Sequence, residues 1–484
     1  MYYIKLFLGP LLFILIGFII QPTGKAESDY TAGIACWMAA WWMVEVVHLM
    51  VTSFLPIILF PLLGIADSKI IAAQYMDQVI FLFIGGFIMG FAIEKTGLHK
   101  RIAFGIMGKI GSNPTGLLAA VMLSAYLISN WISNTATTML LLSAVTSIVS
   151  NLGLEPGGKS SYPSALLIGL AYAASIGGMA TLVGTPPNMV FMGFYNEHFP
   201  NQIDMDFLKW SSLGFPISLL LLGFTFGVLW LFFIRREAVK HFKISERKLE
   251  PEKWSPEEKV VAMVFFAAAF LWLTRSDIEI ASVSWKGWSR LFPKDFVQDS
   301  TVAMLASLVL MAVPVFHRGE DSETSSRFRP ILQFSDVKGL PFEIILLFGS
   351  GFALSKGFEI SGLSNWLASQ LVVFKGTSLI LLLIGLCILV NIISEFASNV
   401  ASIQLVLPIL LPLASVLGVD PLVLMIPATL SASLGFMLPV ATAPNTIVFG
   451  TGFIRTKEMM KVGWLIDLGG IVIISLISWL TFKG

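Results

Sequence analysis

The sequence predicts an all-α polytopic membrane protein with about 11 transmembrane helices and two re-entrant hairpins. Hydrophobic residues make up 56% of the 484 residues and charged residues only 13%, whereas a soluble domain averages roughly 45–50% and 25%. The apolar residues also recur in stretches near the ~20 residues that a helix needs to cross a bilayer. Finally, both halves of the chain carry the same polar motifs. The composition and the length of the apolar stretches therefore indicate that the chain folds in lipid.

Composition also disfavours several other classes of protein. The net charge is +1, and the chain has no basic tail or zinc-type cluster, so we expect no nucleic-acid partner. Cys36 and Cys387 both lie in apolar runs, where a cysteine is usually a small core residue. The apolar run that follows Lys5 resembles a signal peptide, but 22–25 offers no convincing small-residue cleavage site. We therefore expect residues 1–25 to contain a retained first transmembrane helix.

The membrane-length stretches can be placed one by one. They lie near 5–20, 31–50, 52–66, 78–95, 164–196, 213–234, 257–275, 300–316, 341–357, 421–452 and 460–482. Two further apolar stretches, 114–150 and 377–416, are too long for one span and are polar at their middle. Polar backbone at membrane depth is tolerated only inside protein or beside a wet cavity. We therefore predict that these two stretches are re-entrant hairpins.

The distribution of basic residues predicts the orientation. If the N-terminus is cytoplasmic, most of the 31 Lys and Arg residues fall on the cytoplasmic side, as the positive-inside rule requires. The basic stretch 235–256 then becomes a cytoplasmic linker between residues 26–234 and residues 257–484. We expect a multi-pass protein of the inner (plasma) membrane.

These two regions are internal repeats. At an offset of 265 positions, Ser133-Asn134 falls on Ser398-Asn399. After a longer loop in the first half the offset becomes 257, and Pro187-Asn188 then falls on Pro444-Asn445. Each repeat holds five spans and a hairpin, and an odd number of crossings gives the second copy the opposite orientation. Inverted repeats with matching broken segments are typical of secondary transporters.

Four polar clusters carry the chemistry. They span 129–138 and 394–402 at the two hairpin tips, and 184–188 and 441–446 inside two apolar spans. Proline inside a helix removes a hydrogen bond, so both of those spans should unwind and free their carbonyl groups. Carbonyl, hydroxyl and Asn oxygens can bind a hard cation, while the helix that begins at each tip favours an anionic carboxylate. One site can therefore join a cation and an anion.

Simpler interpretations exist for each motif on its own. A single Ser-Asn-Thr is usually an interhelical contact or a cap, and a single Pro-Asn is usually a kink. Pairing of both motifs across the repeats favours a functional role. Glu395 follows Ser394 and corresponds to Asn130, which makes it a candidate for tuning the second cluster, but its role stays open at this point. We interpret Glu45 and His48 as an interfacial pair rather than a proton relay, and Trp41-Trp42 as interface anchors.

These clusters resemble the divalent anion:sodium symporter family, and the resemblance covers nearly the whole chain. Its signature is a paired Ser-Asn-Thr motif. The first copy, Ser133-Asn134-Thr135, is complete, whereas the second, Ser398-Asn399-Val400, has valine in place of threonine. In the fourth cluster, Ala443 stands where a second proline is common in the family. The loss of the hydroxyl at residue 400 bears on substrate choice.

The resemblance implies a homodimer in which each chain has a scaffold domain and an elevator-type transport domain. It implies one sodium ion near Ser129, Ser133, Asn134 and Gly184, and a second near Ser394, Ala397, Asn399 and Ala441. It further implies a substrate site between the tips. The candidate substrate-binding residues are Ser133, Asn134, Thr135, Thr185, Pro187, Ser398, Asn399, Val400, Thr442 and Pro444.

The function that follows is sodium-coupled symport of C4-dicarboxylates such as succinate, fumarate and malate. A sodium-independent dicarboxylate exchanger and a carrier of citrate or sulfate remain as alternatives. An enzyme is disfavoured because His48 is the only histidine within a predicted span and the chain has no His-Glu-x-x-His pattern. A channel is disfavoured because paired hairpins in inverted repeats are typical of carriers.

Overall fold

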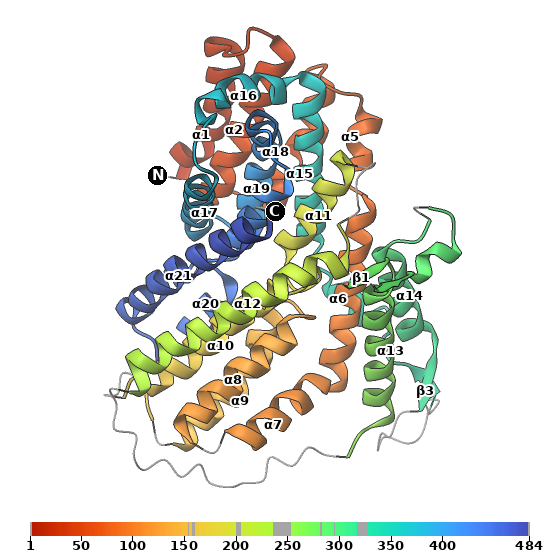
Figure 1. Ribbon diagram of the computed structural model, residues 1–484, viewed down its shortest axis with the longest axis vertical. Helices are drawn as coiled ribbons and strands as arrows, with labels where there is room; N and C mark the ends of the chain where they lie inside the picture. Colours follow the sequence, from red (N-terminus) through yellow and green to blue (C-terminus); the bar gives the residue numbers. More distant parts are fainter. Residues whose placement is uncertain are drawn as a thin grey trace.

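The computed structural model describes residues 2–111, 113–152, 154–156, 160–199, 205–235, 253–280, 283–294, 296–316 and 328–482. Most of the predicted basic linker, 235–256, lies outside these residues. The described chain is mostly helical, as the composition predicts. In Figure 1 the helices α10, α12 and α21 run obliquely through the middle of the molecule, and α8 and α9 lie below them.

The chain begins with six helices. They are α1 (Tyr2–Ile14), which continues into a π-helical turn η1 (Leu15–Ile20), then α2 (Ala26–Val44), α3 (Leu49–Thr52), α4 (Leu55–Leu62), α5 (Ser68–Gln74) and α6 (Gln78–Thr96). Trp42 is fully buried, and Trp41 donates its indole N–H to the carbonyl of Leu6 across 3.0 Å. The interpretation of these two residues as interface anchors was therefore wrong, because Trp42 lies in the protein interior and Trp41 fixes α2 against α1.

The first half of the site comes from the next group of helices. They are α7 (Leu98–Ile110), α8 (Pro114–Ser129), α9 (Asn134–Asn151), α10 (Tyr162–Gly178), α11 (Pro186–His198) and α12 (Phe207–Leu229), which ends in a π-helical turn η2 (Trp230–Ile234). Every residue of α10 is buried, because α8, α9 and α12 surround it. The predicted hairpin 114–150 corresponds to α8 and α9, and the predicted span 164–196 to α10 and α11.

A third group lies beside α6. It contains α13 (Pro256–Leu273), α14 (Asp299–Ala312), the 3-10 helices η3 (Trp288–Leu291) and η4 (Asp336–Gly339), and four short strands. Strand β1 (Ile278–Ile280) pairs antiparallel with β2 (Val283–Trp285), and β3 (Pro314–Phe316) with β4 (Phe328–Pro330). The expected all-α class missed these strands, and the predicted span 300–316 ends as a helix at Ala312. Pro314 cannot continue that helix.

The second half of the chain contains the remaining helices. It contains α15 (Phe342–Ser361), α16 (Leu363–Leu371), the 3-10 turn η5 (Val372–Phe374), α17 (Leu379–Phe396), α18 (Asn399–Leu417), α19 (Leu422–Ala432), α20 (Ala443–Phe449) and α21 (Thr456–Phe482). Gly97 and Gly362 divide α6 from α7 and α15 from α16 with nearly equal φ values of 77° and 78°. Glycine takes this left-handed conformation at little cost. The sequence did not predict α7 and α16.

Each of the eleven predicted spans coincides with helix over most of its length. Within the described residues, seven helical segments are both long and apolar enough to cross a membrane unaided, and several shorter apolar helices accompany them. The short helices arise partly where prolines divide a span, as at α10–α11 and α19–α20. The chain is thus a helical membrane protein, and the count of about 11 crossings stays a prediction.

Candidate functional site

The first hairpin tip is a capped helix start. Ser133 precedes α9, and its hydroxyl accepts from the N–H of Ala136 at 3.3 Å. This contact satisfies one of the N–H groups that the first turn leaves free. The hydroxyl of Ser129, at the end of α8, donates to the Oδ1 of Asn134 across 2.8 Å. Both helices of the hairpin therefore fix the Asn134 side chain.

The second hairpin tip has the same geometry. Ser398 caps α18 and accepts from the N–H of Ala401 at 3.1 Å. Ser394 donates to the Oδ1 of Asn399 across 2.9 Å, and also contacts the carbonyl of Ala432 at 2.5 Å. Ala397 is buried in the turn between α17 and α18.

The unwound segments also match each other. Between α10 and α11, the Nδ2 of Asn188 donates to the carbonyls of Gly178 at 3.0 Å and Thr181 at 2.7 Å. Between α19 and α20, the Nδ2 of Asn445 donates to the carbonyls of Gly435 at 2.8 Å and Leu438 at 3.0 Å. In each case the acceptors lie ten and seven residues before the Asn. The Asn of each Pro-Asn motif therefore folds the unwound segment onto the following helix.

Both Asn residues leave an oxygen free. The Oδ1 atoms of Asn188 and Asn445 are fully buried and have no hydrogen-bond partner among the described residues. A buried carbonyl oxygen without a partner costs free energy, and a hard cation with oxygen ligands would relieve that cost. The donor set at both places is neutral and oxygen-rich, which fits an alkali cation rather than a transition metal. The described residues form no cluster of His, Cys, Asp or Glu of the kind that binds transition metals.

Glycines allow backbone and side-chain oxygen atoms of the first half to lie close together. A Cβ atom on Gly184 would lie 2.6 Å from the carbonyl oxygen of Gly178 and 2.9 Å from that of Ser129. A Cβ atom on Gly178 would lie 2.3 Å from the Oδ1 of Asn134. No side chain fits at either position. The predicted sodium ligands Ser129, Asn134 and Gly184 are therefore neighbours in space.

One cavity of about 390 Å³ lies between the two tips. All ten candidate substrate-binding residues line it, from both hairpins and both unwound segments. It is lined by Phe87, Ser133, Asn134, Thr135, Thr185, Pro186, Pro187, Pro341, Glu343, Ile344, Ser398, Asn399, Val400, Ala441, Thr442, Ala443 and Pro444. A small polar molecule fits a cavity of this size.

Sequence reasoning missed four residues of the cavity wall. Phe87 comes from α6, and Pro341, Glu343 and Ile344 come from the start of α15. These positions lie outside the four polar clusters. Phe87 falls on Phe352 at the offset of 265 positions, and this match was the only signal that could have drawn attention to it. The other three residues reach the cavity wall because α15 packs beside the hairpins, and this packing cannot be read from the sequence.

Glu395 anchors the second unwound segment. Its carboxylate is buried and accepts from the N–H of Met437 at 2.8 Å and of Leu438 at 3.0 Å. The carbonyl of Leu438 in turn accepts from Asn445. The carboxylate is therefore connected to the side-chain amide of Asn445 through one residue, Leu438, and the residue at the corresponding position in the first half, Asn130, is neutral.

His48 has a different partner from the one its sequence neighbours suggest. The Nε2 of His48 lies 3.3 Å from a carboxylate oxygen of Glu343, at the start of α15. Glu45 instead ends α2 in a left-handed conformation with φ 47°. The pairing of His48 with Glu45 was therefore wrong, because the chain turns sharply between these residues.

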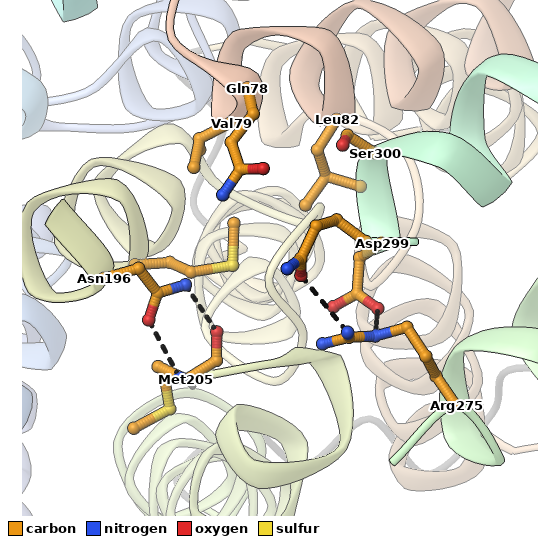
Figure 2. Close-up of a pocket in the computed structure, with 10 residues that line it drawn as sticks. Gln78, Val79, Leu82, Asn196, Met205, Arg275, Asp299 and Ser300 are labelled. Carbon is orange, nitrogen blue, oxygen red and sulfur yellow. Dashed lines mark hydrogen bonds and ion pairs between the residues drawn. The ribbon is translucent and has the colours of Figure 1, made fainter. Parts of the chain in front are cut away.

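A separate buried ion cluster lies around a small pocket away from this cavity. Arg275, just after α13, contacts Asp299 at 2.6 Å and Asp206 at 3.7 Å. Figure 2 shows the Arg275 guanidinium pointing at Asp299, with Gln78 and Asn196 on the opposite side of the pocket. All three ionic side chains are buried. The cluster joins the ends of α12, α13 and α14, which is a structural role.

Comparisons with known proteins agree with this architecture. Residues 2–482 match the family model described as the sodium:sulfate symporter transmembrane region. The chain is 36% identical to the sodium-dependent dicarboxylate transporter SdcS of Staphylococcus saprophyticus, over 98% of this chain and 90% of that protein. The SdcS of a bovine strain of Staphylococcus aureus is also 36% identical, with the same coverage.

Two solved structures share the fold. The YdaH transporter of Alcanivorax borkumensis is 14% identical with a TM-score of 0.54, over 85% of this chain and 88% of that chain. MtrF of Neisseria gonorrhoeae, described with a class of antimetabolite efflux pumps, is 13% identical with the same TM-score, over 92% and 97%. At this identity the likeness concerns the fold alone.

Proposed function

The chain belongs to the sodium:sulfate symporter family, and we propose that it is a secondary active transporter that imports C4-dicarboxylates together with sodium. Members of a transporter family move solutes rather than convert them, so the protein is not an enzyme. The observation that carries the proposal is the single cavity that both hairpin tips line. The substrates we propose are succinate, fumarate and malate.

Neutral groups would bind the substrate. Asn134 and Thr135 begin α9, and Asn399 and Val400 begin α18, so the free N–H groups of two helix starts are available beside the cavity. The positive ends of the two helix dipoles favour a carboxylate group at each tip. Val400 supplies no hydroxyl, so we expect the second tip to make one contact fewer with the substrate than Thr135 allows at the first.

Two sodium ions would supply the positive charge that balances the dianion. The first would lie among Ser129, Ser133, Asn134 and Gly184, and the second among Ser394, Ala397, Asn399 and Ala441. The free oxygens of Asn188 and Asn445 support one ion on each side of the cavity. Since Asn134 and Asn399 contribute to both kinds of site, binding of cations and binding of the dianion would favour each other. This linkage is the physical basis that we propose for symport.

We propose that the two halves are inverted repeats and that transport follows an elevator-type motion. The recurrence of the Ser129–Asn134 contact as Ser394–Asn399 supports the repeats. The hairpins and unwound helices would form the transport domain, while α2–α6 and α13–α15 would belong to the scaffold. We further propose a homodimer in the plasma membrane with a cytoplasmic N-terminus. The mass of the purified protein, after correction for detergent, tests the dimer.

Uptake of labelled succinate into proteoliposomes tests the function. We expect an inward sodium gradient to drive uptake and an equal potassium gradient to leave it at background. Uptake that is indifferent to sodium would reject the coupling. Stimulation by internal succinate without sodium would instead indicate a dicarboxylate exchanger. Competition by sulfate and by citrate tests the remaining substrates, of which sulfate is favoured by the family description.

A further inference from the structure

A single charged side chain lies on the wall of the central cavity in the described part of the chain. That residue is Glu343, and the other lining residues are uncharged. It lies in the first turn of α15, where the positive end of the helix dipole stabilises a carboxylate. An acidic group beside a site proposed for dianions repels the substrate, so its presence calls for an explanation.

His48 lies beside this carboxylate. Its Nε2 lies 3.3 Å from Glu343, and the two side chains are 61% and 51% exposed. Water therefore reaches both groups and screens the negative charge of Glu343 in part. His48 precedes α3 as its N-cap residue, so the pair connects α15 to the turn between α2 and α3.

Neither residue belongs to the elements that would carry the substrate. Helix α15 packs against α2, α3, α4 and α5, although it also meets α11 and α18. In the proposed elevator motion the hairpin tips would leave this position, while Glu343 and His48 would stay behind. With a cytoplasmic N-terminus, α1 and α2 cross the membrane twice and return the α2–α3 turn to the cytoplasmic face.

We infer that Glu343 is a one-sided electrostatic element that weakens dianion binding when the cavity faces the cytoplasm and so promotes release. The inference rests on the proposed function. Its charge acts on the substrate in one state and not in the other. The inference therefore predicts that the affinity for the substrate differs between the two sides of the membrane. A charge that moved with the site would not produce this difference.

The test compares the KM for succinate on each side of vesicles of known orientation. Glu343→Gln should lower the cytoplasmic KM by about threefold or more, leave the external KM unchanged, and lose its effect at high salt. Glu359→Gln is the control, since Glu359 lies on the same helix and pairs with Lys356 away from the cavity.

Two results would overturn the inference. One is a cytoplasmic KM that Glu343→Gln leaves unchanged, and the other is an equal change on both sides. Failure of the proposed function looks different, because wild-type vesicles would then show no sodium-driven succinate uptake. In that case the same variants are compared with labelled sulfate, to which the like-charge argument applies equally.

Discussion

The hydroxyl of Ser129 donates to the Oδ1 of Asn134 across 2.8 Å, from the last residue of one helix to the first of the next. The contact recurs between Ser394 and Asn399 at 2.9 Å. These bonds hold two amide side chains at the wall of one cavity. Because the contacts are local to each tip, the tips can keep their shape while the surrounding helices move.

Replacement of either tip asparagine should abolish transport. Asn134→Ala and Asn399→Ala each remove an oxygen that we place next to both sodium and substrate. We expect uptake of labelled succinate at background, with normal membrane levels and little change in melting temperature. Near-normal uptake by both variants at matched protein levels would contradict the proposed site.

Replacement of the Asn in either unwound segment should weaken sodium binding. Asn188→Ala and Asn445→Ala each remove one buried Oδ1 that has no protein partner in the described chain, together with the Nδ2 group that donates to two carbonyls of the segment. We expect the half-saturating sodium concentration to rise about tenfold, roughly 1.4 kcal/mol, and the Hill coefficient to fall. Sodium titrations of uptake measure both. An unchanged sodium dependence in active variants would place the cations elsewhere.

Gly178 and Gly435 occupy matching positions but differ in the space that they leave for a side chain. A Cβ atom at residue 178 would lie 2.3 Å from the Oδ1 of Asn134, whereas one at residue 435 would lie 3.2 Å from its nearest neighbour, the Cγ2 of Thr442. Gly178→Ala should therefore abolish uptake, and Gly435→Ala should retain a substantial part of it. If Gly178→Ala retains as much uptake as Gly435→Ala, the first tip tolerates displacement of Asn134.

Loss of the Glu395 carboxylate should disturb the second sodium site more than the first. Glu395→Gln replaces one of the two acceptors for Met437 and Leu438 with an amide N–H group. We expect weaker sodium binding and a lower melting temperature in detergent. Asn130→Ala, at the corresponding place in the first half, is the comparison. If the melting temperature falls but the sodium dependence does not change, the role of Glu395 is purely structural.

The buried ion cluster should matter for stability. Arg275→Ala leaves Asp206 and Asp299 buried without their cation, which should destabilise the protein by about 3–5 kcal/mol. Thermal unfolding in detergent measures the change. Arg290→Ala is the control, because Arg290 pairs with Asp277 on the surface and should leave the melting temperature unchanged. Similar melting temperatures for both variants would contradict the expectation.

The sequence by itself determined the local features of this protein. Serine caps at residues 133 and 398, and proline at residues 187 and 444, act within a few residues of themselves, so their effects can be read without a partner. The repeated order of these motifs also predicted which polar residues belong together. Hydropathy placed the helices, because lipid imposes both their length and their composition.

Only the tertiary structure decided the contacts between distant helices. The approach of Glu343 to His48, of Glu395 to the N–H groups of Met437 and Leu438, and of Arg275 to Asp299 left no periodic signal in the sequence. The physical reason is that apolar helices in lipid have similar outer surfaces, so hydropathy fixes where a helix begins and ends but not which helix lies beside it. Small residues and single polar contacts make that choice, as Gly85 does against Ala303.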